Sequence, residues 1–185
     1  AKTSKKQEAL EALNEYFETF TDGLFEHEVQ VAKDSLFFDV NDANLSTKLA
    51  DYEKLENTYR DDSIGKRAIY EKAKLMLENS MYKQVLASKD KLLELDATVY
   101  EDIQQIINDA AVGAMEEALK EKECHSVLKI STEYSIKLSD SWDDGIYECA
   151  MKGADFLLAK NTASKNLKSK DLEVRKKWLY RYIKV

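Results

Sequence analysis

The stretch that decides the fold is residues 98–124, which read TVYEDIQQIINDAAVGAMEEALKEKEC. Its apolar residues recur three and four positions apart, the spacing that places them on one face of a helix. Thr98 followed by Glu101 matches a capping box, in which both side chains accept hydrogen bonds from amides at the start of a helix. We therefore predict a long and largely buried helix over 98–124.

Small residues concentrate in the second half of this stretch. A helix with small side chains on its buried face lets a neighbouring element approach closely, so we expect tight packing there. In particular, we predict that Ile106 and Ala110 are almost completely buried. The small residues are Ala110, Ala111, Gly113, Ala114 and Ala118.

The composition of the whole chain also favours helices. The 185 residues contain no proline and five glycines, so the strongest helix breakers are nearly absent. We predict a mainly α fold, an irregular bundle of five to seven helices around the central helix 98–124. A break near Asn79 and Ser80 should divide the helical pattern of 63–95, and residues 35–44 are expected to be non-helical.

A minor β element is expected near 128–138. Every even position of this stretch is apolar or threonine, and every odd position is polar. Two-residue alternation of this kind is typical of a half-buried strand. Val127, Ile130, Tyr134 and Leu138 would also share one face of a helix, so both structures stay open, and we favour the strand.

The last part of the chain differs in composition from the rest. Residues 161–170 contain one large apolar side chain, and we interpret them as a polar linker between a helical body, 1–160, and a C-terminal arm, 171–185. The arm combines basic and aromatic residues. Its end, 178–185, fits a strand and a helix equally well.

Charge is distributed unevenly between these parts. Residues 165–185 hold eight basic and two acidic side chains, which gives a net charge of +6. Because the whole chain carries a net charge of −7, the other 164 residues carry −13. The arm therefore suits the chain's own acidic body, an identical neighbour, nucleic acid or an anionic membrane surface. We predict that it buries Trp178, Leu179 and Ile183 against an acidic surface of a neighbouring copy, because large apolar side chains are costly to leave in water.

The predicted partner-binding residues all lie in the arm. They are Arg175, Lys176, Lys177, Trp178, Leu179, Tyr180, Arg181, Tyr182 and Ile183.

We predict no catalytic residue, no cofactor site and no metal site. Glu121, Cys124 and His125 could share one side of a helix, but a zinc site needs three or four ligands, and no further ligand follows from the sequence. The segment 42–53 has the acidic ends of a calcium loop but holds Thr47 where that loop needs glycine.

The function predicted from these observations is non-enzymatic: a structural or assembly protein that acts through protein–protein contacts in a homo-oligomer. The low-proline composition, rich in Lys, Glu, Asn and Tyr, also fits a viral or phage particle component. The alternative is a nucleic-acid-associated factor that uses the basic arm. However, the net charge of −7 argues against general nucleic-acid binding, which needs surplus basic charge.

We expect a cytoplasmic protein, or a virion protein if the chain is viral. No apolar run approaches the roughly 20 residues that a membrane-spanning helix needs. Cys124 and Cys149 are the only cysteines, and two thiols in a chain of this size favour a reducing compartment. We therefore predict that both are reduced and not bonded to each other.

Overall fold

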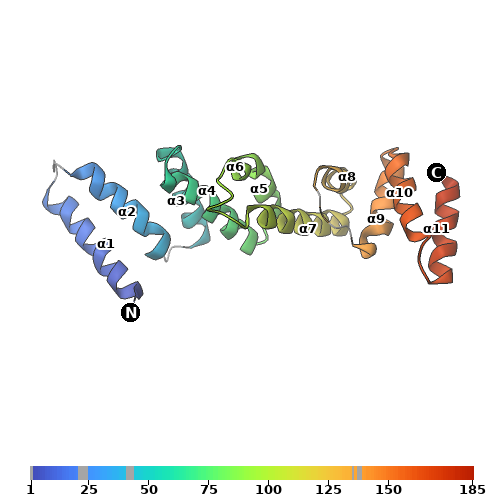
Figure 1. Ribbon diagram of the computed structural model, residues 1–185, viewed down its shortest axis with the longest axis horizontal. Helices are drawn as coiled ribbons and strands as arrows, with labels where there is room; N and C mark the ends of the chain where they lie inside the picture. The colour runs from blue at the N-terminus through green and yellow to red at the C-terminus, as the bar shows by residue number, and fades with distance from the viewer. Residues whose placement is uncertain (1, 21–24, 41–43, 135, 137–138) are drawn as a thin grey trace. The chain divides into compact units, whose positions relative to one another are not determined.

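The computed structural model describes residues 2–20, 25–40, 44–134, 136 and 139–185 (Figure 1). These residues form eleven α-helices and one 3₁₀ helix and contain no strand. The mainly α prediction is confirmed, but the helices outnumber the five to seven expected. They are α1 (Lys2–Thr19), α2 (Glu26–Val40), α3 (Leu45–Thr58), α4 (Ser63–Glu78), α5 (Tyr82–Ala87), α6 (Lys89–Leu93), α7 (Ile103–Glu121), α8 (Cys124–Glu133), η1 (Asp140–Trp142), α9 (Asp143–Lys152), α10 (Phe156–Asn166) and α11 (Leu172–Lys184).

The helices group into two compact units, Ala1–Leu75 and Met76–Val185. In the first unit α1 packs on α2, and an aromatic core joins α2 to α3 and α4. The ring of Phe38 stacks on Tyr52 with centroids 5.8 Å apart, and Phe37 meets the same tyrosine edge-on. Residues 35–40 are therefore helical, contrary to the prediction, because α2 carries these rings into the core; residues 41–43 of the predicted non-helical segment lie outside the described residues.

A buried hydroxyl ties α2 to the end of α3. The hydroxyl of Tyr59 donates a hydrogen bond of 2.6 Å to the Asp34 carboxylate. Burial, followed by this hydrogen bond and the negative charge of Asp34, raises the pKa of Tyr59 to about 12. Tyr59 therefore stays neutral and keeps donating throughout the physiological pH range.

In the second unit each helix packs mainly on its neighbours in the chain. The contacts run from α5 to α7, α7 to α8, α8 to α9, α9 to α10 and α10 to α11. The predicted break between α4 and α5 is confirmed: Ser80 has φ of 58°, a left-handed conformation that ends a helix. The unit is thus a succession of helices in which each interface depends on local side-chain fit.

Helix α7 is the central element of this unit, although it is shorter than predicted. The amide and hydroxyl of Thr98 both donate to Asp96 Oδ1, at 2.8 and 2.7 Å, so Thr98 belongs to a turn and α7 begins five residues later. Ile106 and Ala110 are buried, as predicted. A Cβ atom on Gly113 would lie 2.5 Å from the ring of Tyr82, so the glycine provides the space that α5 needs to pack on α7.

The predicted strand near 128–138 is wrong where the structure describes it. Residues 128–133 belong to α8, and Tyr134 is its C-terminal cap. Helical spacing buries Val127 and Ile130 together, and that gain in packing outweighs the two-residue alternation. Positions 135, 137 and 138 of the predicted strand lie outside the described residues.

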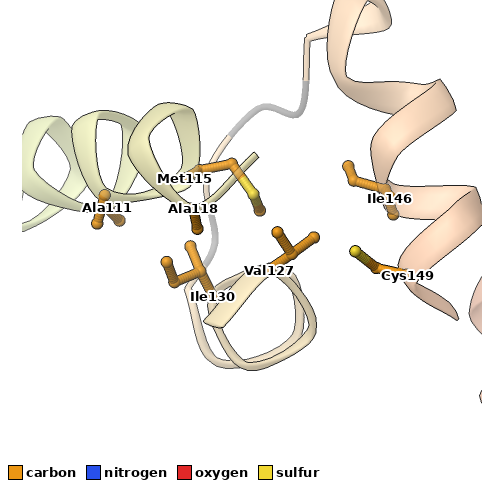
Figure 2. Packing of buried hydrophobic residues seen from close by; sticks show 8 residues of the cluster. Ala111, Met115, Ala118, Val127, Ile130, Ile146 and Cys149 are labelled. Atoms are coloured by element: carbon orange, nitrogen blue, oxygen red, sulfur yellow. The ribbon is translucent and has the colours of Figure 1, made fainter. Parts of the chain in front are cut away.

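The main core of the second unit lies where α7, α8 and α9 meet (Figure 2). Side chains from all three helices point toward one another, with Val127 of α8 between those of α7 and those of α9. The cluster contains Ala111, Ala114, Met115, Ala118, Val127, Ile130, Ile146 and Cys149.

A disulfide bond closes one edge of this core. It joins Cys124, the first residue of α8, to Cys149 in α9, with Cα atoms 4.8 Å apart. The prediction of two reduced thiols is therefore wrong. The two cysteines lie 25 residues apart, and only the packing of α8 on α9 brings them together. Since disulfides are typical of oxidising compartments, the thiol argument for a cytoplasmic location no longer holds.

Substitution of Ala110 by leucine tests the close packing of α7. We expect Ala110→Leu to lower the free energy of unfolding by about 1–3 kcal/mol, because the extra side chain overpacks a fully buried position. Glu116→Leu, at an exposed position of the same helix, is the matched control. It should change the free energy of unfolding by less than about 0.5 kcal/mol. Equal effects in urea unfolding would show that the small face of α7 is not tightly packed.

Removal of the disulfide tests the link between α8 and α9. A bond that closes a loop of 25 residues restricts the unfolded chain and should contribute about 3 kcal/mol. We expect dithiothreitol to lower the melting temperature of the native chain. It should not change the melting temperature of the variant in which alanine replaces both cysteines. Thiol titration in denaturant should find no free thiol in the native protein, and two free thiols would contradict the bond.

Candidate protein-binding surface on the C-terminal helix

The predicted arm is the helix α11, and it packs on its own chain. Asp171 caps the helix, since its carboxylate accepts hydrogen bonds from the amides of Glu173 and Val174 at 2.8 and 3.2 Å. The end of the chain, which fitted strand and helix equally well, is therefore helical to Lys184. The first part of the predicted linker, 161–166, forms the last turns of α10, and α10 packs on α11 (Figure 1).

The side chain of Trp178 anchors α11. It is 3% exposed and packs in a cluster with residues of α9 and α10. Three alanines in this cluster, Ala150, Ala159 and Ala163, leave room for the indole ring. The ring of Tyr147 meets it edge-on, with centroids 5.8 Å apart. Trp178 therefore belongs to the core of this chain, where its side chain is covered by α9 and α10.

Arg181, one turn after Trp178, attaches the same face of α11 to α9. Its guanidinium lies 4.6 Å from the ring centre of Trp178 and 4.8 Å from that of Tyr147, within range of cation–π attraction. It also forms ion pairs with Asp144 and Glu148 of α9. The Tyr147 hydroxyl also donates a hydrogen bond of 3.0 Å to the backbone carbonyl of Arg181.

Asp144 forms ion pairs with two basic side chains of α11. The Nζ of Lys177 lies 2.6 Å from Asp144 Oδ2, and Arg181 binds the other oxygen. Partial burial alone would raise the pKa of Asp144, but the hydrogen bonds from Lys177 and Arg181 outweigh it, so the pKa is lowered from its ordinary value. The carboxylate is thus ionised at neutral pH and attracts the helix.

A second acidic residue fixes α10 against α9. Asp143 is almost fully buried and accepts hydrogen bonds from Asn166 Nδ2 at 2.6 Å and from Lys165 Nζ at 3.3 Å. Lys165 also reaches Asp140, at 2.8 Å. Because Asp143 and Asp144 are adjacent, one turn of α9 holds both α10 and α11.

The opposite side of α11 carries an apolar stripe in solvent. Leu172, Leu179 and Ile183 are 55%, 49% and 74% exposed. Residues seven and eleven positions apart lie nearly on one line along a helix, so these three side chains form a stripe along the helix. We call it the outer face of α11. Large apolar side chains grouped in this way mark an interaction surface more often than isolated ones do.

Charged residues border the outer face. Arg175, Lys176 and Lys184 are exposed beside it, and so is Glu173. The Nζ of Lys176 lies 2.8 Å from Glu173 Oε1, as expected for residues three positions apart on a helix. The surface therefore combines an apolar centre with a polar rim, which is the usual composition of a protein–protein contact.

The structure divides the predicted partner-binding residues between two faces. Trp178 is buried, Lys177 and Arg181 pair with α9, and Tyr182 packs against the cluster around Trp178. The exposed residues among them are Arg175, Lys176, Lys177, Leu179, Tyr180 and Ile183, and of these Lys177 is paired with Asp144.

Two parts of this arrangement were not predicted from the sequence. Leu172 belongs to the outer face, and its spacing of seven and eleven residues from Leu179 and Ile183 was the available signal. Asp144 and Glu148 stand one turn apart and match the one-turn spacing of Lys177 and Arg181, and this match is the signal that the sequence offered for the pairing.

Other kinds of site have less support. Among the described residues no group of three or more His, Cys, Asp and Glu side chains is placed to hold a metal ion. A hollow of about 530 Å³ lies beside α11, but Lys165 and Lys177 at its wall already pair with acidic residues. None of the described helices combines the length and the apolar composition required to cross a membrane.

Comparison with models of known protein families gives no match, and comparison with curated proteins gives none either. The surface must therefore be interpreted from its own chemistry.

Neutralising Asp144 tests how α11 is held. We expect Asp144→Asn to lower the free energy of unfolding at pH 7 by up to about 1 kcal/mol, because the ion pairs of this half-exposed carboxylate are screened by solvent. The lowered pKa means that this stability is present above the ordinary carboxyl pKa and is lost as the pH falls through the folded-state value. The difference between variant and parent should therefore shrink toward pH 3.

Thermal unfolding followed by Trp178 fluorescence, in a Trp142→Phe background, measures this difference at each pH. Glu101→Gln, at an exposed carboxylate elsewhere in the unit, is the control and should show little effect at either pH. A difference that stays constant from pH 7 to pH 3 would show that Asp144 does not act through its charge.

Proposed function

We propose that this chain is a non-enzymatic assembly protein that works through protein–protein contacts in a homo-oligomer, with the outer face of α11 as its contact surface. The observation that carries the proposal is the exposed stripe of Leu172, Leu179 and Ile183 on a helix whose other face is firmly docked. Burying one such side chain is worth about 1.5–3 kcal/mol, so three of them offer a substantial driving force.

The docking of α11 on its own chain makes this surface suitable for binding. A flexible arm would have to become ordered on contact, and that ordering costs binding free energy. Here Trp178, Arg181 and Lys177 already hold the helix, so the stripe is presented in a fixed orientation. The composition supports a narrower proposal, that such an assembly belongs to a viral or phage particle.

A nucleic-acid-associated role is the second proposal, and the exposed cations Arg175, Lys176 and Lys184 support it. Two further basic residues of the arm, Lys177 and Arg181, are engaged by Asp144, which reduces the positive charge available to phosphates. The apolar stripe has no role in phosphate binding, so the assembly proposal accounts for more of the surface.

Replacing apolar residues of the outer face by glutamate tests the assembly proposal. We expect the variant Leu179→Glu with Ile183→Glu to have a lower mass in sedimentation equilibrium than the native chain, approaching the 21.3 kDa monomer. Val99→Glu, at an exposed apolar position outside α11, should keep the native mass. Circular dichroism should show that all variants keep their helices.

If the double variant has the same mass as the native chain, or the native chain is itself a monomer, the assembly proposal is wrong. Salt-dependent binding of labelled DNA by a monomeric native chain would then favour the nucleic-acid role.

A further inference from the structure

We propose that α11 forms one half of a two-fold symmetric helix pair, in which its outer face packs antiparallel on the outer face of a second copy. This inference rests on the proposed function, and it adds which surface of the neighbour is bound. The charge distribution of the sequence predicted that the arm binds the acidic body of a neighbouring copy. In the present proposal α11 binds α11 of that copy.

The charge that α11 presents outward permits such a pair. The arm as a whole is strongly basic, which would make two arms repel each other. However, Lys177 and Arg181 point toward α9 and are paired there with Asp144 and Glu148. The exposed charges of α11 that remain are Arg175, Lys176 and Lys184 against Glu173, three cations and one anion with a net of +2. The pairing with α9 therefore reduces the repulsion between two outer faces.

The outer face, taken together with Lys176 beside it, has the same spacing when the helix is reversed. Leu172, Lys176, Leu179 and Ile183 are spaced by four, three and four residues. An axis midway between residues 177 and 178 therefore places Leu172 opposite Ile183 of the second copy, and the reverse contact forms at the other end. Lys176 comes to lie beside Leu179 of the second copy, where its aliphatic stem can cover the leucine while the ammonium stays in water.

The charges beside the stripe distinguish this orientation from the parallel one. Glu173 and Lys184 stand eleven residues apart, which is close to three full turns, so they border the same side of the outer face. In the antiparallel pair Glu173 of one copy lies within about 3 Å, measured along the axis, of Lys184 of the other. Two such ion pairs form per dimer, and the helix dipoles oppose each other favourably. In a parallel two-fold pair the sides that carry Glu173 and Lys184 fall on opposite sides of the contact, so these two ion pairs do not form.

The size of the contact predicts a weak and closed assembly. A helix of 13 residues is about 20 Å long, and one face of it buries less area than the roughly 1,200–2,000 Å² of a stable complex. We therefore expect a dimer in exchange with monomer at micromolar concentrations. Because the contact uses the same surface on both copies, it closes at two and does not extend into a filament.

Charge reversal in the full chain tests the orientation by sedimentation equilibrium over a range of concentrations. We expect Glu173→Lys and Lys184→Glu to weaken dimerisation by about fivefold each, because each puts like charges together at both ends of the pair. The variant with both reversals restores the opposite charges and should return to within about twofold of the native affinity. Lys120→Glu, which makes the same charge change on an exposed site of α7, is the control and should have no effect.

The outcomes separate this inference from the proposed function. If Leu179→Glu with Ile183→Glu dissociates the assembly but the double reversal fails to restore affinity, α11 is a contact surface and the antiparallel pair is wrong. Native assemblies that grow beyond two copies would equally overturn the closed pair. If the glutamate variant leaves the mass unchanged, both proposals fail.

Discussion

The burial of Trp178 determines which side of the C-terminal helix faces solvent. Once the indole ring lies against Tyr147 and the alanines of α9 and α10, the rotation of α11 about its own axis is set. Arg181 and Lys177 reinforce this rotation through Asp144, because they lie near the same side of the helix as Trp178. Leu172, Leu179 and Ile183 are then necessarily directed outward.

This arrangement depends in turn on how α9 is held. Its inner side contributes Ile146 and Cys149 to the core shared with α7 and α8, and the disulfide attaches it to the start of α8. Its first turn carries Asp143 and Asp144, which bind α10 and α11. A single ten-residue helix thus connects the central core to the candidate binding surface.

A docked helix and a mobile arm would act differently in an assembly. An arm on a flexible linker reaches a distant surface and loses conformational freedom when it binds. Helix α11 has already lost that freedom within its own chain, through contacts that a partner does not need to supply. The proposed contact through its outer face would therefore be preformed and of low area, which suits reversible association.

The sequence by itself determined the features that depend on local spacing. The absence of proline and the helical periodicity predicted a mainly α chain, the break near Ser80, and the burial of Ile106 and Ala110. Each of these follows from residues within a few turns of one another, so no knowledge of distant neighbours was needed.

Only the tertiary structure decided the features that depend on residues far apart in the chain. Residues 128–133 satisfy two periodicities, and their packing on α7 selects the helix. Cys124 and Cys149 are brought together by the contact of α8 with α9. Which side of α11 is buried depends on Tyr147 and Asp144, more than 30 residues away from Trp178 and Arg181. The sequence shows that this helix is apolar on more than one side, and the fold selects the side that stays exposed.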